Sequence, residues 1–301
     1  MTSSAQALSF TGKNTTRALE RWLYAMQQTS GCPERMPLNV LRPEVSCRLQ
    51  LYGQEADSDY HFCEPPRARP GCLAYSFGVN NQIAFEVDLA RKTDLSVWAF
   101  DNHSVATTFM LDGKDEHDHK KRPARLPPRL HYRPQMLWNT TLGLKEVPLG
   151  IRYGFHNRKE PWVFREFGDL AHALGHRVRD VRLMKVDIEG AEYRVLPGLL
   201  RRAKMLEQIT LEIHTHVHDV ERDWQLRYAS QAEWVSLQME FVRHGFKLAS
   251  IRNEKVAPGS SVCEKVQYSE QLWVHPERME SNSPCSSAGV ELPQLGELPL
   301  P

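Results

Sequence analysis

Short apolar runs alternate with amphipathic segments between residues 72 and 274, and this alternation constrains the fold more than any other feature of the chain. The apolar runs have the length of buried strands, and the segments between them have the periodicity of helices. Strands that alternate with helices predict a parallel, doubly wound α/β sheet. Only a short link joins the last two strands, so we expect the final strand to be antiparallel.

The expected elements follow from glycines, prolines and periodicity. The expected strands are 72–78, 97–100, 130–138, 182–186, 209–213, 246–251 and 266–274. The expected helices include 82–91, 164–174, a helix with a break at Pro197, and one that stops near Gly245.

We divide the chain into three parts. Residues 1–44 are interpreted as a helical and irregular extension, with a helix over 15–28, and the proline-containing stretch 31–70 is expected to be irregular. Residues 45–275 form the folded domain. Residues 276–301 are rich in Ser, Pro and Glu without periodicity, which predicts a disordered tail.

Charge balance and apolar runs give no support for several classes of partner or for membrane targeting. The net charge is +1, with 38 basic and 37 acidic side chains, so bulk charge gives no support for binding nucleic acid or a membrane surface. No apolar run approaches the roughly 18 residues of a transmembrane helix. The first ten residues lack the charged start and apolar stretch of a signal peptide, which we do not expect here.

The six cysteines leave the compartment open. They are Cys32, Cys47, Cys63, Cys72, Cys263 and Cys285. No CxxC pair occurs and the His117-Asp118-His119 cluster lies in a charged loop, so we expect no metal site. Four cysteines in the first quarter of the chain are consistent with disulfides in a secretory lumen, or with free thiols in the cytosol, which the missing signal favours.

Three expected strands end in residues suited to hold a ligand. Gly78, Asp101 and Asp187 follow the first, second and fourth strands, and ligands of open α/β sheets bind at the carboxyl ends of strands. Asp101 lies 23 residues after Gly78 (101 − 78), close to the spacing at which an acid binds a ribose. A dinucleotide requires G-x-G-x-x-G, whereas Gly78 is followed by Val79 and Asn80. A nucleoside without phosphate, such as S-adenosylmethionine, therefore fits better.

The acids after the fourth strand have several possible roles. Asp187 could accept hydrogen bonds from a ligand, act as a general base, or cap the next helix. Glu189 is a weaker candidate for the same site, and Glu192 fits the first turn of the helix. Glu212, His214, His216 and His218 occupy every second position at the end of the fifth strand, so their side chains are expected on one side. His214 is a possible base, and the other two histidines fit a surface run.

Four segments resemble a known family: Tyr75-Ser-Phe-Gly78, Val97-Trp-Ala-Phe-Asp101, Lys185-Val-Asp-Ile-Glu-Gly-Ala-Glu192 and Leu211-Glu-Ile-His214. Through them the chain resembles FkbM-type class I S-adenosylmethionine-dependent methyltransferases, and most closely the methyltransferase-like protein 24 group, over about residues 45–275. The Lys-x-Asp-Ile-Glu-Gly-x-Glu segment is the most specific to this type. The resemblance implies a Rossmann-like, mostly parallel sheet with an antiparallel last strand.

The resemblance also implies the chemistry. S-adenosylmethionine is the expected cofactor, with Gly78 and its neighbours on the methionine part and Asp101 on the ribose. The expected cofactor-binding residues are Ser76, Phe77, Gly78, Asn80, Asp101 and Asp187. Asp187 and His214 are the candidates for removing the acceptor's proton.

The expected reaction is O-methylation of a hydroxyl on a small molecule or sugar. The expected partner is therefore a small-molecule or glycan acceptor, without nucleic acid and without a membrane span. One alternative is an interaction module that keeps the fold without catalysis, because the glycine loop is reduced to Gly78. Another is a nicotinamide-dependent oxidoreductase, against which the same loop argues.

Overall fold

The computed structural model describes most of the predicted domain. The described residues are 41–53, 59–64, 71–79, 83–101, 126–148, 159–214, 216–219, 225–254, 268–281 and 284–285. The helix expected over 15–28, the candidate residue Asn80 and the histidines at 117 and 119 lie outside them.

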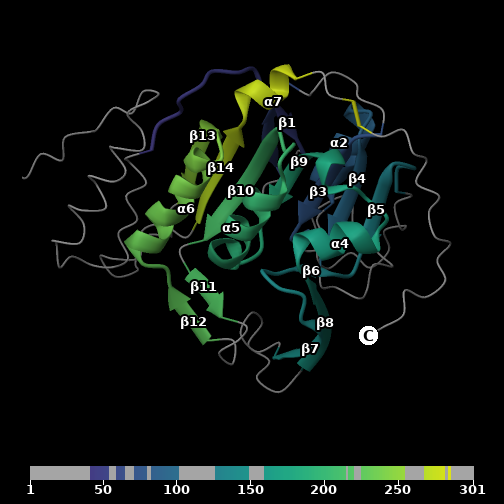
Figure 1. Ribbon diagram of the computed structural model, residues 1–301, viewed down its shortest axis with the longest axis vertical. Coiled ribbons are helices and arrows are strands. Elements are labelled where there is room, and N and C mark those ends of the chain that lie inside the picture. Colours follow the sequence, from purple (N-terminus) through teal and green to yellow (C-terminus); the bar gives the residue numbers. More distant parts are fainter. Residues whose placement is uncertain are drawn as a thin grey trace, which may run out of the picture.

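A seven-stranded sheet forms the centre of the molecule (Figure 1), in the order β13-β14-β10-β9-β3-β4-β5. Its strands are β3 (Leu73–Phe77), β4 (Ser96–Phe100), β5 (Leu130–Arg133), β9 (Val181–Val186), β10 (Gln208–His214), β13 (Lys247–Glu254) and β14 (Tyr268–Val274). The pairs β3–β4, β4–β5, β3–β9 and β9–β10 are parallel, whereas β14 is antiparallel to both of its neighbours. The mostly parallel sheet with an antiparallel last strand is therefore confirmed.

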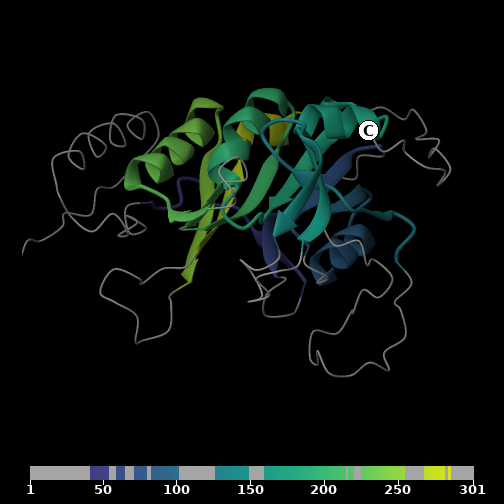
Figure 2. The ribbon, with the colours of Figure 1, turned by 90° about the horizontal axis from the view of Figure 1, so that it is seen from below.

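Helices cover one face of the sheet, and a helix with a β-hairpin covers the other (Figure 2). The first face carries α4 (Phe167–Ala173), α5 (Glu192–Arg202) and α6 (Gln231–Arg243). The second carries α2 (Ala84–Lys92) with the antiparallel pair β1 (Leu49–Tyr52) and β2 (Tyr60–Cys63). Strands β3 and β9 are buried along their whole length, and Phe77 and Ala74 of β3 belong to separate apolar clusters. This two-sided burial is why these strands read as continuous apolar runs.

Helix α5 runs through Pro197 without the expected break. A proline inside a helix removes one backbone hydrogen bond, which costs about 3 kcal/mol. The apolar stripe of Val195, Leu196, Leu199 and Leu200 is buried against the core. Tertiary packing of that stripe outweighs the lost hydrogen bond, since packing supplies most of a helix's stability in proteins.

Several strands differ from the expectation. The stretch 31–70, expected to be irregular, contains β1 and β2. The strand expected over 130–138 is divided into β5 and β6 (Met136–Leu137), and β6 joins β7 (Gly143–Pro148) and β8 (Lys159–Arg165) in a separate sheet. Beyond His214 the chain forms a hairpin of β11 (His216–Asp219) and β12 (Gln225–Tyr228) instead of continuing β10. The β6-β8-β7 sheet and the β11-β12 pair lie at the lower side of Figure 1, next to the carboxyl ends of β5 and β10.

Two disulfides tie the N-terminal and C-terminal parts of the described chain to the domain. Cys47 is bonded to Cys63, and Cys72 to Cys285, so the four described cysteines are all paired. Short helix α7 (Pro276–Glu280) and buried Cys285 show that the expected disordered tail starts with an ordered segment. No helix among the described residues is both long and apolar enough to cross a membrane.

A buried histidine predicts acid sensitivity of this fold. Nδ1 of His176 lies 2.5 Å from the Tyr75 hydroxyl, and burial lowers the pKa of His176 from 6.5 to about 4. The unfolded chain therefore binds a proton at a higher pH than the native one, and stability present above pH 6.5 is lost as the pH falls towards about 4. Denaturant midpoints between pH 7.5 and pH 4 should fall less steeply in His176→Asn, whose amide oxygen can still accept from Tyr75. An unchanged slope would contradict this role of His176.

Candidate functional site

The three strand ends chosen from the sequence meet at one edge of the sheet. β3 lies between β4 and β9, so Gly78 is flanked by Asp101 and Asp187. The Gly78 amide donates to the Phe100 carbonyl at 3.0 Å, and the Asp187 amide to the Phe77 carbonyl at 3.1 Å. After β5 the chain crosses to the other side of β3, so this edge is the topological switch point where α/β sheets bind ligands.

Gly78 is required by the packing of two strand ends. Its φ is +78°, and a Cβ atom built on it would lie 1.5 Å from the Asp187 carbonyl oxygen. The backbone that approaches Gly78 closely is thus that of Asp187. The neighbouring Val79 amide donates to Asp101 Oδ2 at 2.6 Å, which holds this buried carboxylate against the start of the loop.

Asp187 is held by a buried lysine and a tyrosine. Its Oδ2 accepts from Lys185 Nζ and from the Tyr60 hydroxyl, both at 3.1 Å, and Lys185 Nζ also donates to the Gly78 carbonyl. Burial would lower the pKa of Lys185, but Asp187 and Glu86 outweigh it and the pKa lies above its usual value. Ala191 is the N-cap residue of α5, so Asp187 does not cap this helix.

The side chains of Ser76 and Phe77 point away from the strand ends into the two layers. The Ser76 hydroxyl donates to Glu86 Oε1 of α2 at 2.5 Å. Phe77 stacks on Phe100 in the core beneath the helices, with ring centroids 4.9 Å apart. Burial raises the pKa of Glu86, which the charge of Lys185 opposes. Of Ser76 and Phe77, only the backbone can therefore line the strand-end site.

A second group of acids surrounds His214 at the end of β10. Its Nδ1 lies 3.2 Å from Glu192 Oε1, and its Nε2 lies 3.1 Å from Glu212 Oε1 and 3.6 Å from Glu189 Oε2. Burial would lower the pKa of His214, but Glu192 and Glu212 raise it well above 6.5. Burial, together with Asp187, raises the pKa of Glu212 to about 7.

Glu192 and Glu189 are placed by the turn that links β9 to α5. Glu192 is the first residue of α5, as expected, and its Oε1 also accepts from the Ile188 amide at 3.0 Å. Glu189 has a φ of 57°, the only positive value of a non-glycine residue in the described part of the chain. Such a backbone is uncommon outside glycine and is often retained at functional sites.

Sequence reasoning missed three residues of this site. Lys185 and Glu86 are charged residues inside apolar segments, and that position itself signals a buried partner, because buried charges are almost always paired. Tyr60 lay in the stretch expected to be irregular, although Tyr-His-Phe-Cys is a plausible strand. The proximity of these three side chains depends on tertiary structure.

Comparison with known proteins gives the class of this molecule. A family model described as a methyltransferase domain matches residues 13–256, well over half of the chain. Together with the order of strands, this match defines a class I S-adenosylmethionine-dependent methyltransferase. The chain belongs to this methyltransferase domain family.

Individual proteins add little to this assignment. Coclaurine N-methyltransferase bound to N-methylheliamine and SAH aligns with 10% identity over 86% of this chain and 93% of its own, with a TM-score of 0.36. Precorrin-6y C5,15-methyltransferase from Geobacter metallireducens aligns with 9% identity over 69% and 81%, with a TM-score of 0.31. Both scores are low, so the assignment rests on the family model and on the strand order.

A curated ribosomal protein matches a smaller segment. The small ribosomal subunit protein uS4 from Caldivirga maquilingensis is 30% identical over 81 residues, which are 27% of this chain. The match spans 43% of that relative's length.

The strand-end residues fit S-adenosylmethionine, a cofactor without phosphate. The amides of Gly78 and Val79 donate to the Phe100 carbonyl and to Asp101, so neither can cradle a phosphate as in a dinucleotide fold. The carboxylates of Asp101 and Asp187 suit ribose hydroxyls and the positive charges of a sulfonium and an ammonium group. The acceptor groups of these described residues are therefore compatible with the cofactor of the family.

Proposed function

We propose that this chain is an FkbM-type O-methyltransferase that methylates a hydroxyl group of a small molecule or glycan. The observation that carries the proposal is the meeting of Gly78, Asp101 and Asp187 at the switch point of the sheet. The family supplies the reaction class, and S-adenosylmethionine supplies an activated methyl group when it is bound.

Each strand end has a proposed task. Asp101 binds the ribose hydroxyls, and the backbone around Ser76, Phe77, Gly78 and Asn80 lies along the methionine part of the cofactor. Asp187 is the better of the two candidates for accepting the proton of the hydroxyl. Both ring nitrogens of His214 face carboxylates at 3.1–3.2 Å, so neither nitrogen is placed to accept the proton of an acceptor hydroxyl. Positioning supplies most of the rate in a displacement of this kind.

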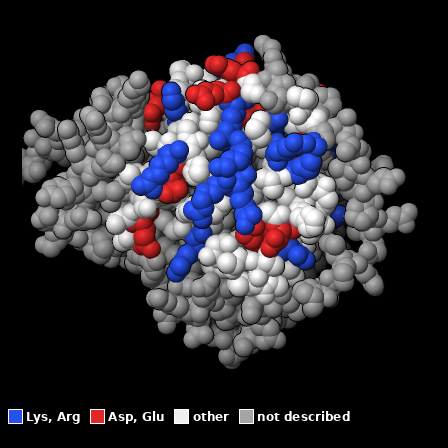
Figure 3. Space-filling model, in the orientation of Figure 1, with Lys and Arg blue, Asp and Glu red and all other residues white. Residues whose placement is uncertain are grey.

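Surface charge supports a small acceptor. Lys and Arg side chains gather over the helical face in Figure 3. On α5 and α6, Arg202 pairs with Glu166 at 2.8 Å and Arg243 with Glu240 at 2.6 Å. The strand-end site instead contains mainly carboxylates, with Lys185 already bonded to Asp187. An acidic site disfavours a polyanion such as nucleic acid and suits an uncharged hydroxyl.

We expect Asp101→Asn to weaken S-adenosylmethionine binding about 10- to 100-fold, because a hydrogen bond to a charged group contributes about 1.5–3 kcal/mol. The asparagine oxygen can still accept from the Val79 amide, so the loop should stay in place. Isothermal titration calorimetry measures the affinity. Asp88→Asn on α2 is the matched control, since Asp88 bonds Gly53 and Lys92 away from the strand ends.

The same titration separates this proposal from its alternative. A folded wild-type chain that does not bind S-adenosylmethionine at millimolar concentration would identify an interaction module instead of an enzyme. Binding with unchanged affinity in Asp101→Asn would refute the ribose assignment. Transfer of labelled methyl groups to a panel of hydroxyl compounds then tests the class of acceptor.

A further inference from the structure

We infer that the acids around His214 form a binding site for one divalent metal ion. Asp187, Glu212 and His214 each offer a ligand atom, and these atoms all lie within 4.8 Å of one another. They come from the carboxyl ends of the paired strands β9 and β10. Beside these three, Glu189 Oε2 lies 3.6 Å from His214 Nε2.

The spacing of the ligand atoms suits an ion. His214 Nε2 and Glu212 Oε1 are 3.1 Å apart. Ligands at right angles around an ion with bonds of about 2.1 Å are separated by about 3 Å. Two carboxylate oxygens and an imidazole nitrogen form a mixed oxygen and nitrogen set, which suits ions such as Mn²⁺.

The Nδ1 side of the His214 ring is arranged as in metal-binding histidines. His214 Nδ1 lies 3.2 Å from Glu192 Oε1, and Glu192 is held by the Ile188 amide. A carboxylate that accepts from one imidazole nitrogen directs the lone pair of the other nitrogen outward, towards a metal. Here the outward nitrogen, Nε2, faces Glu212 and Glu189, two groups that can only accept when ionised.

The negative charge of the cluster also favours binding of a cation. Four carboxylates, those of Asp187, Glu189, Glu192 and Glu212, lie around His214, and Lys185 Nζ is 3.1 Å from that of Asp187. Glu192 is fully buried, and its Oε2 has no hydrogen-bond partner in the described part of the chain. Buried negative charges are costly unless they are paired or coordinate a metal. Asp187, Glu189 and Glu212 retain partial exposure, so an ion can reach them from solvent.

An ion in this position would change how the acceptor is activated. It would lie at the carboxyl end of the sheet, where a hydroxyl bound to it would have a lowered pKa. Asp187 would then act as a ligand instead of accepting the proton directly. This consequence rests on the proposed function, whereas the ion site itself does not.

The test is a titration of the full chain with Mn²⁺ after dialysis against a chelator, with free Mn²⁺ followed by electron paramagnetic resonance. We expect one ion per chain, at least about tenfold weaker binding in Glu212→Gln, and about 10- to 100-fold weaker binding in Glu192→Gln. Glu240→Gln is the matched control, because it removes a carboxylate 3.7 Å from another histidine, His244, and should leave binding unchanged.

Two outcomes overturn the inference. One is a folded wild-type chain that binds no Mn²⁺ at millimolar concentration, which would show that a proton on His214 holds the cluster together. The other is equal Mn²⁺ binding by Glu212→Gln. If this variant does not fold, Glu189→Gln replaces it, since that side chain is 38% exposed. Calorimetry with S-adenosylmethionine is independent of Mn²⁺ binding, so failure of the ion site and failure of the proposed function are distinguishable.

Discussion

Replacing Gly78 by alanine is expected to destabilise the native state by more than about 4 kcal/mol, an unusually large effect for one methyl group. The new Cβ would lie 1.5 Å from the carbonyl oxygen of Asp187. Backbone atoms at this distance cannot be avoided by a side-chain rotation, so the ends of β3 and β9 must move apart. Chemical denaturation followed by circular dichroism measures the loss.

Gly175→Ala is the matched control for this experiment. Gly175 has a similar φ of +69°, but apart from its chain neighbours no atom of the described residues lies within 4 Å of a Cβ built there. Gly175→Ala should therefore lower the free energy of unfolding by only about 1 kcal/mol, the cost of holding an alanine at positive φ. Equal losses in the two variants would show that φ alone requires glycine at position 78, and that the contact with Asp187 does not.

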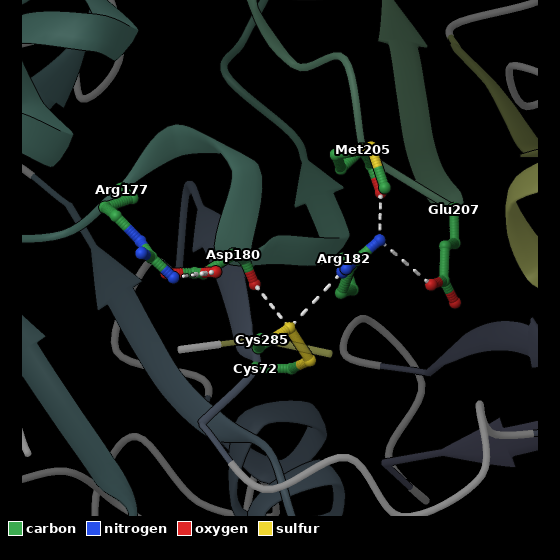
Figure 4. The surroundings of a disulfide bond; sticks show 7 residues. All are labelled: Cys72, Arg177, Asp180, Arg182, Met205, Glu207 and Cys285. Carbon is green, nitrogen blue, oxygen red and sulfur yellow. Dashed lines mark hydrogen bonds and ion pairs between the residues drawn. A yellow bond between two sulfur atoms is a disulfide. The ribbon is translucent and has the colours of Figure 1, made fainter. Parts of the chain in front are cut away.

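Removing the Cys72–Cys285 disulfide is expected to have the second large effect. The bond joins residues 213 positions apart, and the loop-entropy relation assigns a closed loop of this length about 5 kcal/mol. Figure 4 shows the bond next to Arg182, whose Nε lies 3.3 Å from Cys285 Sγ and which pairs with Glu207 at 3.5 Å. The double variant Cys72→Ala/Cys285→Ala should unfold at a much lower denaturant concentration.

The Cys47–Cys63 bond provides the comparison. Its partners are 16 positions apart, for which the same relation gives about 3 kcal/mol. Cys47→Ala/Cys63→Ala should therefore lose less stability than the other double variant. A larger loss from the short loop would contradict the entropic account. Disulfides persist mainly in oxidising compartments, and counting free thiols in protein from its native cells tests whether both bonds form there.

The sequence predicted the main sheet because its strands are buried on both faces. Runs such as Leu183, Met184 and Val186 have no other stable environment in a globular domain. The small sheets were missed for the opposite reason. β1 has four residues, of which Leu49 and Leu51 are exposed apolar side chains, and β6 has two residues, so neither carries a readable pattern.

The candidate site was only partly predictable. Gly78, Asp101 and Asp187 could be assigned because strand ends in a parallel sheet share one edge. The contact of Asp187 with Tyr60 could not be predicted, because the two residues are 127 positions apart in the sequence. His214 was chosen as a base, but only the structure shows carboxylates on both of its nitrogens.

The chain by itself thus determined the class of fold and the methyltransferase class, and it predicted the edge of the sheet that carries the candidate site, since each depends on local periodicity or on a contiguous motif. Tertiary structure decided the cysteine pairs, the buried Lys185 between Gly78 and Asp187, and the acids around His214. These depend on contacts between residues far apart in the chain. Local sequence patterns do not reveal such contacts, because packing and burial establish them only when the whole sheet has formed.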